Sequence, residues 1–437
     1  MAPAMKEPKI TPTSKSRNPF KHLRRSDIRG IAQLATQATE GVTRIVEGVH
    51  QSVWSTLGVT GGKSPGQTGG ITGLVYTSIR GINQLLGEGV GTALAGLESL
   101  LERGEGAEPG TPQRERVLAA LNGVIGDRLA TGNSPFATPM TMWHRGEMLA
   151  WPDPPSLSEA TAKVAVLIHG LCMNDLQWHT QHDGQVVDHG EALASALDYT
   201  PIYLRYNSGL HTSHNGRELS AQLEQLVTNW PTPIDDLTVV AHSMGGLLVR
   251  SALFSAEQED LCWPDHLKNM VFLGTPHHGA PLEKAGNWID VVLGSTPFTA
   301  PFNRLGQLRS SGITDLRYGN LLDEDWHGHD RFHHTPDNRQ IVPLPEGVAC
   351  FTVAATTAAK SSPLADRLTG DGLVPVRSAL GQHDDPRRTL AFASASQRTE
   401  HCTNHLGLLS SPEVTRQLVR WLEPAKDGAF LHDQDEL

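Results

Sequence analysis

A serine at the end of an apolar stretch is the residue best placed to do chemistry in this chain. Ser243 lies in the segment VVAHSMGGLLVRSA, where an apolar run meets a tight turn and then apolar residues at helical spacing. Ala241 and Gly245 stand two residues to either side, and a sharp strand-to-helix turn requires small side chains there. Such an elbow exposes the hydroxyl beside a helix N-terminus, which favours a developing negative charge. The pattern predicts a nucleophile for acyl transfer; an incidental serine in a glycine-rich turn is the alternative.

A serine nucleophile needs a base, and the base needs an orienting carboxylate. Asp371 lies between two glycines in TGDGLVPV, just before an apolar step, which predicts a tight loop at a strand end. His405 precedes an apolar run and the last amphipathic stretch of the chain. These two side chains are candidates for the acid and the base, with His401 as the alternative base and Asp384 and Asp385 as reserve carboxylates.

Short apolar runs alternate with amphipathic stretches from residue 163 onward, and these elements must position the reactive side chains. The apolar runs predict strands at 164–168, 201–206, 237–241, 270–273 and 348–354. The amphipathic stretches predict helices near 189–197, 216–229, 245–256 and 413–422. Upstream, we expect a helix near 113–129 and a hairpin across 140–151. Strands that alternate with helices indicate an α/β fold with a mostly parallel central sheet.

Four blocks between about residues 163 and 422 carry a family resemblance. They are, in order, VAVLIHGL, VVAHSMGGLLVRSA, NMVFLGTPHHGAP and TGDGLVPVRSALG. Together they resemble α/β-hydrolase lipases and esterases, especially bacterial lipases with an AHSMGG elbow. The resemblance implies an α/β-hydrolase fold and a triad of Ser243, Asp371 and His405, with no cofactor. It also implies that the backbone N–H groups of Leu171 and Met244 form the oxyanion hole.

The function that we predict is hydrolysis of carboxylic esters through an acyl-enzyme, on an ester or lipid substrate with an apolar acyl chain. An acyltransferase would use the same triad with an alcohol in place of water. A non-catalytic, membrane-associated scaffold protein on the same fold is a further alternative. Cys172 lies near the predicted oxyanion turn, but the setting of Ser243 favours the serine as nucleophile.

The segment 281–345 predicts a cap or lid insertion over the site. Its apolar residues Trp288, Val292, Phe298 and Phe302 are candidates for an acyl pocket, with packing inside the cap as the alternative. A histidine-rich stretch follows at 325–334, where His329 and His333 stand at helical spacing for a zinc ion. The glycine at 328 and the lack of periodicity favour a polar loop, so no metal is predicted. For His277 and His278, in the GTPHHG block, we expect a structural role.

Composition and charge limit the classes of function. The net charge of −11 argues against a general nucleic-acid binder. The four cysteines lie far apart without a CxxC pair, which fits reduced thiols better than a disulfide framework. No apolar run approaches the roughly 20 residues of a membrane-spanning helix. The basic N-terminus lacks the apolar region of a secretory signal. A cytoplasmic location is therefore expected, with peripheral membrane association left open.

The chain is predicted to have four parts. A flexible basic arm spans 1–25, an N-terminal helical module 26–135, the α/β-hydrolase domain 136–425 and an acidic tail 426–437. Within the module, two amphipathic stretches joined by a glycine-rich turn predict a helical hairpin. Three roles stay open for residues 26–102: packing on the hydrolase, forming a homo-oligomer, or contacting a membrane or lipid surface.

Overall fold

The computed structural model describes residues 112–152, 157, 159–280, 310–328, 337–359 and 370–423. The arm, residues 26–102 and the acidic tail lie outside these ranges. So do Trp288, Val292, Phe298 and Phe302, the candidates for an acyl pocket, and His329 and His333, whose spacing suits a zinc ion but for which no metal is predicted.

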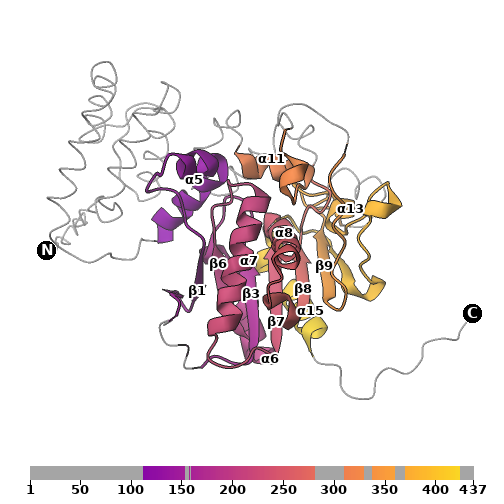
Figure 1. The fold of residues 1–437 in the computed structure, drawn as a ribbon. Coiled ribbons are helices and arrows are strands. Elements are labelled where there is room, and N and C mark those ends of the chain that lie inside the picture. Colours follow the sequence, from indigo (N-terminus) through magenta and orange to yellow (C-terminus); the bar gives the residue numbers. More distant parts are fainter. Residues whose placement is uncertain are drawn as a thin grey trace, which may run out of the picture.

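An eight-stranded sheet forms the centre of the described molecule (Figure 1). Its order is β10-β9-β8-β7-β3-β6-β1-β2. The strands are β1 (Thr141–His144), β2 (Glu147–Met148), β3 (Lys163–Ile168), β6 (Thr200–Arg205), β7 (Asp236–His242), β8 (Leu267–Leu273), β9 (Ala349–Ala355) and β10 (Gln397–Glu400). Neighbours from β10 to β6 are parallel, whereas β1 pairs antiparallel with both β6 and β2. A separate hairpin joins β4 (Thr180–His182) and β5 (Gln185–Val187).

Helices cover both faces of this sheet. They are α5 (Pro112–Thr131), α6 (His189–Leu197), α7 (Thr212–Asn229), α8 (Met244–Glu259), α9 (Trp263–His266), α11 (Ser311–Tyr318), α13 (Val376–Ala379), α14 (Gly407–Ser410) and α15 (Pro412–Leu422). The side chains of β3 show the two layers. Val166 and Ile168 pack with residues of α7 and α8, and Leu167 packs with residues of α6 and α15. Because successive side chains of a strand point to opposite faces, a strand buried on both sides must be apolar throughout.

The expected α/β architecture is confirmed, as are the five strands and four helices predicted from residue 163 onward. The predicted hairpin is present as β1 and β2, with Gly146 at a φ of 81° in its turn. Three other elements, β10, the β4–β5 hairpin and α11, were not predicted from the sequence. Among the described residues, no helix is both long and apolar enough to pass through a bilayer.

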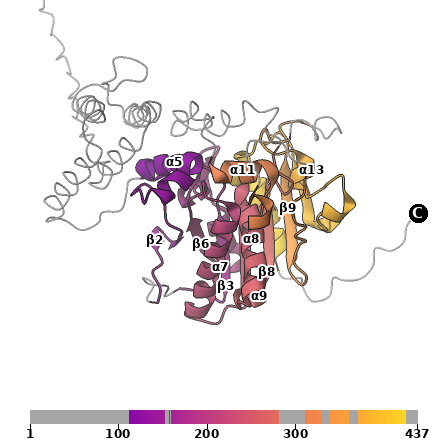
Figure 2. The ribbon, with the colours of Figure 1, turned by 45° about the horizontal axis from the view of Figure 1, so that its top comes forward.

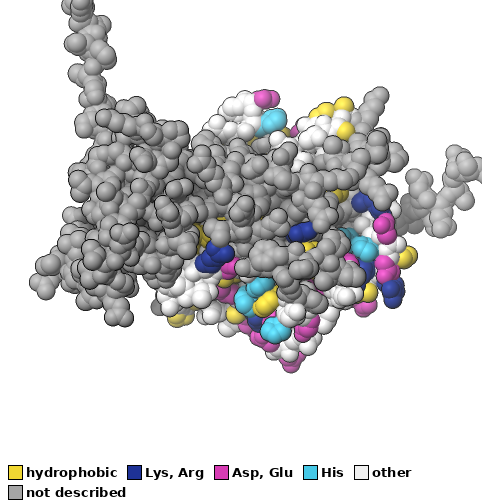
Figure 3. All heavy atoms as spheres, turned by 90° about the horizontal axis from the view of Figure 1, so that it is seen from above, with side chains coloured by type: hydrophobic (Ala, Val, Ile, Leu, Met, Phe, Trp, Pro, Cys, Tyr) yellow, Lys and Arg dark blue, Asp and Glu magenta, His cyan; other side chains and the backbone are white. Residues whose placement is uncertain are grey.

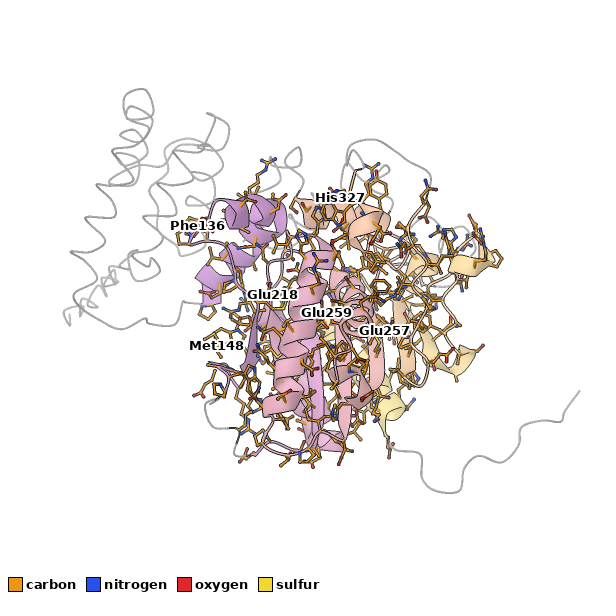
Figure 4. All side chains as sticks on the ribbon, viewed as in Figure 1. Phe136, Met148, Glu218, Glu257, Glu259 and His327 are labelled. Carbon is orange, nitrogen blue, oxygen red and sulfur yellow. The ribbon has the colours of Figure 1, made fainter. Side chains whose placement is uncertain are left out.

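The helices α5 and α11 lie side by side across one end of the sheet (Figures 1 and 2). One apolar cluster joins Leu129 of α5 and Ile313 of α11 to Leu171 and Met244. Phe136, just after α5, belongs to the same cluster, and His327 lies above the sheet on the same side (Figure 4). Thus α5 packs directly on the hydrolase core, although its residues fall in the range that we assigned to the N-terminal module.

The described part of the face at this end of the sheet is mixed in charge. Acidic, basic and histidine side chains alternate there among neutral ones (Figure 3). Two ion pairs among the described residues join Arg217 to Asp323 and Arg377 to Asp384. The exposed fractions of these four side chains range from 38% to 79%.

Candidate active site

The turn between β7 and α8 consists of one residue, Ser243. Its φ of 54° and ψ of −123° are strained for a residue with a side chain, as expected for a nucleophile elbow. The Ser243 N–H donates to the carbonyl of Leu273 across 2.8 Å, which fixes the turn to the end of β8. The residue is only 5% exposed. The elbow therefore holds its serine rigidly at the carboxyl end of the central strands.

Two glycines let the backbone close around the elbow. A Cβ atom on Gly245 would lie 2.7 Å from the carbonyl oxygen of Ile168, so only glycine allows α8 to start against the end of β3. A Cβ on Gly170 would lie 2.9 Å from the Cβ of Ser243. The small residue predicted at position 245 is therefore a packing requirement, and Gly170 brings the oxyanion turn against the serine.

Asp371 and His405 meet although 34 residues separate them. The Nδ1 atom of His405 lies 2.6 Å from Oδ2 of Asp371. Their side chains are 6% and 0% exposed. Because a carboxylate only accepts hydrogen bonds, Nδ1 is the donor of this bond, and a neutral imidazole with its proton on Nδ1 has Nε2 as an acceptor. This arrangement suits a general base.

The acid loop holds its carboxylate from both sides. Oδ1 of Asp371 accepts the N–H groups of Leu373 and Val374 at 2.9 and 2.7 Å. The N–H of His405 donates to the Asp371 carbonyl across 3.1 Å. Gly370, at a φ of 46°, makes the close turn possible, since a Cβ there would lie 2.0 Å from the Val374 carbonyl oxygen.

The alternative acids and base lie elsewhere. Asp384 is 79% exposed and pairs with Arg377. Asp385 pairs with Arg387. His401 is exposed. The structure therefore brings Asp371 to His405 and does not bring the reserve residues together.

Ser243 and His405 approach the end of β8 from two sides. A Cβ on Gly274 would lie 3.2 Å from both Cε1 and Nδ1 of the His405 ring, while Ser243 bonds to the preceding residue, Leu273. The ring of His242, the residue before Ser243, has its centroid 4.7 Å from that of His405. Within the described part of the chain, the Ser243 hydroxyl makes no hydrogen bond to His405. In unliganded enzymes such bonds are often long and tighten with substrate.

The proposed oxyanion donors have free amides. In the described ranges, neither the Leu171 N–H nor the Met244 N–H donates to another group. Met244 is the first residue of α8, where the N–H groups have no partner inside the helix. The residues are 6% and 1% exposed. Two unpaired amides beside a serine are what an oxyanion hole requires.

Neighbouring histidines are kept neutral. Burial lowers the pKa of His169 to about 3. Burial, with a smaller contribution from His405, also holds the pKa of His242 well below its ordinary value. His242 Nε2 donates to the backbone carbonyl of His405 across 3.2 Å. His169 and His242 therefore add no positive charge to the surroundings of Ser243 at neutral pH.

The two histidines of the GTPHHG block, residues 274–279, contact other parts of the described structure. His277 Nδ1 lies 3.4 Å from Nη1 of the buried Arg250. His278 Nε2 donates to the Gly381 carbonyl across 3.0 Å. Both histidines therefore contact the framework, in line with the structural role expected for them.

Sequence reasoning missed residues that support the site from a distance. Ser208 accepts the N–H of Cys172 at 3.0 Å, and His242 holds the carbonyl of His405. Ser208 belongs to an Asn-Ser-Gly turn directly after a predicted strand, which was a usable signal. The contact of Ser208 with Cys172 could not be predicted from the sequence, because a tertiary contact leaves no local pattern.

Comparison with known proteins agrees with this architecture. Residues 159–342 match the family model described as a PGAP1-like alpha/beta domain. That range contains Ser243 and excludes α5, Asp371 and His405. Together with the parallel sheet and the elbow, the match agrees with an α/β-hydrolase fold that resembles those of lipases and esterases. No curated protein matches the sequence significantly.

The solved structures that match this chain include two lipases and a thioesterase. The mature lipase BlEst2 of Bacillus licheniformis is 17% identical, with 65% of this chain and 98% of that chain covered and a TM-score of 0.36. Lipase B of Aspergillus fumigatus is 11% identical, with 90% and 84% covered and a TM-score of 0.41. The RedJ thioesterase of Streptomyces coelicolor is 13% identical, with 62% and 96% covered and a TM-score of 0.31.

Proposed function

We propose that this protein is a serine hydrolase that cleaves carboxylic esters through an acyl-enzyme. The observation that carries the proposal is the buried pair of His405 and Asp371, held 2.6 Å apart beside a serine on a strained elbow. A hydroxyl needs a base to become a nucleophile, and the orientation of that base is set by a carboxylate.

Acylation uses each of these groups in turn. Nε2 of His405 takes the proton of the Ser243 hydroxyl as Oγ attacks the ester carbonyl. Asp371 holds the imidazole in the required tautomer and stabilises its cation. The amides of Leu171 and Met244 receive the negative charge that forms on the carbonyl oxygen. His405 then gives the proton to the leaving alcohol, and the acyl group stays on Ser243.

Deacylation repeats these steps with water. His405 takes a proton from a water molecule that attacks the acyl-enzyme, and the proton returns to Oγ as the carboxylic acid leaves. No cofactor takes part in this sequence of steps.

The surroundings of the oxyanion residues favour an apolar acyl group. Leu171 and Met244 share a buried cluster with Ile313 and Leu316 of α11. A polar acyl chain beside such a wall would lose hydrogen bonds to water without replacement. We therefore propose a lipase or esterase substrate.

Hydrolysis of p-nitrophenyl esters from acetate to palmitate tests this function. We expect turnover, with kcat/KM rising from acetate towards longer chains. Product analysis with added glycerol separates hydrolysis from acyl transfer: free fatty acid as the main product supports the hydrolase. Predominant glycerol ester would instead favour the acyltransferase alternative. No turnover of any ester would overturn the proposal.

A further inference from the structure

Helix α5 lies directly against the turn that carries one proposed oxyanion donor. A Cβ atom on Gly123 would lie 2.3 Å from Sγ of Cys172 and 2.8 Å from both its Cα and its N. Two of these three atoms are backbone, so no small side-chain movement would make room. The α5 backbone therefore forms the wall behind residue 172.

A second contact interlocks α5 with the loop after β6. A Cβ on Gly126 would lie 1.9 Å from Oδ1 of Asn207, and Nδ2 of Asn207 donates to the Gly126 carbonyl across 3.0 Å. From the other side, a Cβ on Gly209 would lie 2.1 Å from the carbonyl oxygen of Asn122. Glycine at positions 123 and 126 weakens α5 by about 1 kcal/mol each relative to alanine. Here it permits backbone-to-backbone approach.

Polar bonds fix α5 at this distance. Nη1 of Arg205, at the end of β6, lies 3.0 Å from Oε2 of Glu115, and Nε of the same guanidinium lies 2.5 Å from Asp175. The Ser310 hydroxyl donates to the Gly123 carbonyl across 2.6 Å. The helix is thus held to the sheet, to the oxyanion turn and to the segment before α11.

The turn at Cys172 links helix α5 to the proposed oxyanion donor, the Leu171 N–H. Cys172 has a φ of 60°, and its N–H donates to Ser208. That bond occupies the amide of residue 172, whereas in the described ranges the preceding amide, that of Leu171, donates to no other group. The Leu171 N–H belongs to the preceding peptide unit, which joins that of Cys172 at the Leu171 Cα. A displacement of the Cys172 backbone therefore reaches the Leu171 amide through a single pair of backbone dihedral angles.

We propose that Gly123 is a positioning residue, which sets the place of the Leu171 amide through close backbone contact with Cys172. The inference rests on the proposed function. It adds that the oxyanion hole is completed by a helix outside the range that matches the family model.

The variant Gly123→Ala tests this role. We expect kcat for a p-nitrophenyl ester, per active site titrated with a fluorophosphonate, to fall roughly 10- to 100-fold, as for an ångström-scale misplacement. KM should stay within about twofold. Binding of a boronic acid, whose tetrahedral adduct places an oxygen in the oxyanion hole, should weaken by a similar factor.

Two controls separate positioning from general damage. Arg128→Ala changes an exposed position of α5, and Leu226→Ala opens a cavity in α7 within the separate core cluster on which α7 packs. Both should keep wild-type kcat per titrated site, even if Leu226→Ala lowers the melting temperature. If Gly123→Ala does not fold, Ser208→Ala removes the partner of the Cys172 amide without a clash, and it should lower kcat at constant KM.

Wild-type kcat per titrated site and unchanged boronate affinity in Gly123→Ala would overturn the inference, while leaving the proposed function intact. The same result in Ser208→Ala would overturn it if Gly123→Ala does not fold. A wild-type protein without hydrolysis of any ester would overturn the proposed function itself, and the positioning role with it.

Discussion

His405 and Asp371 are joined by two hydrogen bonds, one from each part of the histidine. The side-chain Nδ1 donates to Oδ2 across 2.6 Å, and the backbone N–H donates to the Asp371 carbonyl across 3.1 Å. The backbone bond fixes the loop and the side-chain bond fixes the ring. The imidazole is therefore oriented even before a substrate binds, which shortens the path to a productive geometry.

Asp371→Asn should reduce kcat by about 10³- to 10⁴-fold, because an amide can donate to Nδ1 and so favours the wrong tautomer of His405. The fold should persist, since the amide oxygen can still accept from Leu373 and Val374. Ester kinetics with circular dichroism check both points. The matched change Asp384→Asn, at an exposed reserve carboxylate, should leave kcat unaltered. An Asp371→Asn enzyme with near wild-type kcat would remove Asp371 from the mechanism.

Thiol reagents should spare Cys172. Burial raises the pKa of this thiol to about 12, so very little thiolate is present at neutral pH. The exposed Cys262 and Cys402 should be carbamidomethylated first. Peptide mapping after a short iodoacetamide treatment measures this order, with ester hydrolysis recorded in parallel. Rapid labelling of Cys172, with loss of activity, would contradict the burial and reopen a catalytic thiol.

Stability should fall as the solution becomes acidic. Burial lowers the pKa of His278 to about 4, and that of His169 to about 3, from an ordinary value of 6.5. Between the folded and the unfolded pKa, the unfolded chain binds more protons. The free energy of unfolding is therefore largest above about pH 6.5 and decreases below it, by up to about 1.4 kcal/mol per pH unit for each histidine.

Urea midpoints from about pH 7.5 to about pH 5 measure this slope. His278→Gln keeps a donor towards the Gly381 carbonyl but cannot titrate, so its midpoint should depend less on pH than that of the wild type. A wild-type midpoint that is constant or rises towards pH 5 would contradict the prediction.

Arg205 should be a large contributor to the docking of α5. Its guanidinium and the side chains of Glu115 and Asp175 are only 11%, 13% and 8% exposed. Arg205→Met removes the buried guanidinium from its contacts with both carboxylates, so we expect a loss of about 3 kcal/mol in unfolding free energy. Hydrogen exchange should also speed up along α5.

The exposed pair of Arg217 and Asp323 supplies the matched control for Arg205→Met. Its side chains are 44% and 42% exposed, so Arg217→Met should cost less than about 1 kcal/mol. Equal losses in the two variants would show that the buried network does not hold α5.

The sequence predicted the elements whose burial leaves a local pattern. The strand at 164–168 is apolar at every position because both of its faces are covered, and the last helix repeats its apolar residues at helical spacing. β10, with the sequence QRTE, has no such pattern, since it lies at the edge of the sheet and its first three residues are half-buried. It is defined by pairing with β9, which local patterns do not reveal.

The candidate site follows the same rule. Ser243 and Asp371 stand in turns whose glycines mark a required backbone geometry, so their neighbourhood was informative. The contact of α5 with the oxyanion turn could not be predicted from the sequence, because the need for glycine at position 123 arises only from its packing against Cys172. The proposed roles of Ser243, Asp371 and His405 remain predictions that chemistry must test.

The most direct test of the central claim is to trap the acyl-enzyme. Wild-type protein mixed with a p-nitrophenyl ester should release about one equivalent of p-nitrophenol in a burst. Intact-protein mass spectrometry should show one added acyl group, and peptide mapping should locate it on Ser243. Ser243→Ala should show neither burst nor adduct at an unchanged melting temperature. An acyl group found on another residue, or full hydrolysis by Ser243→Ala, would contradict the account.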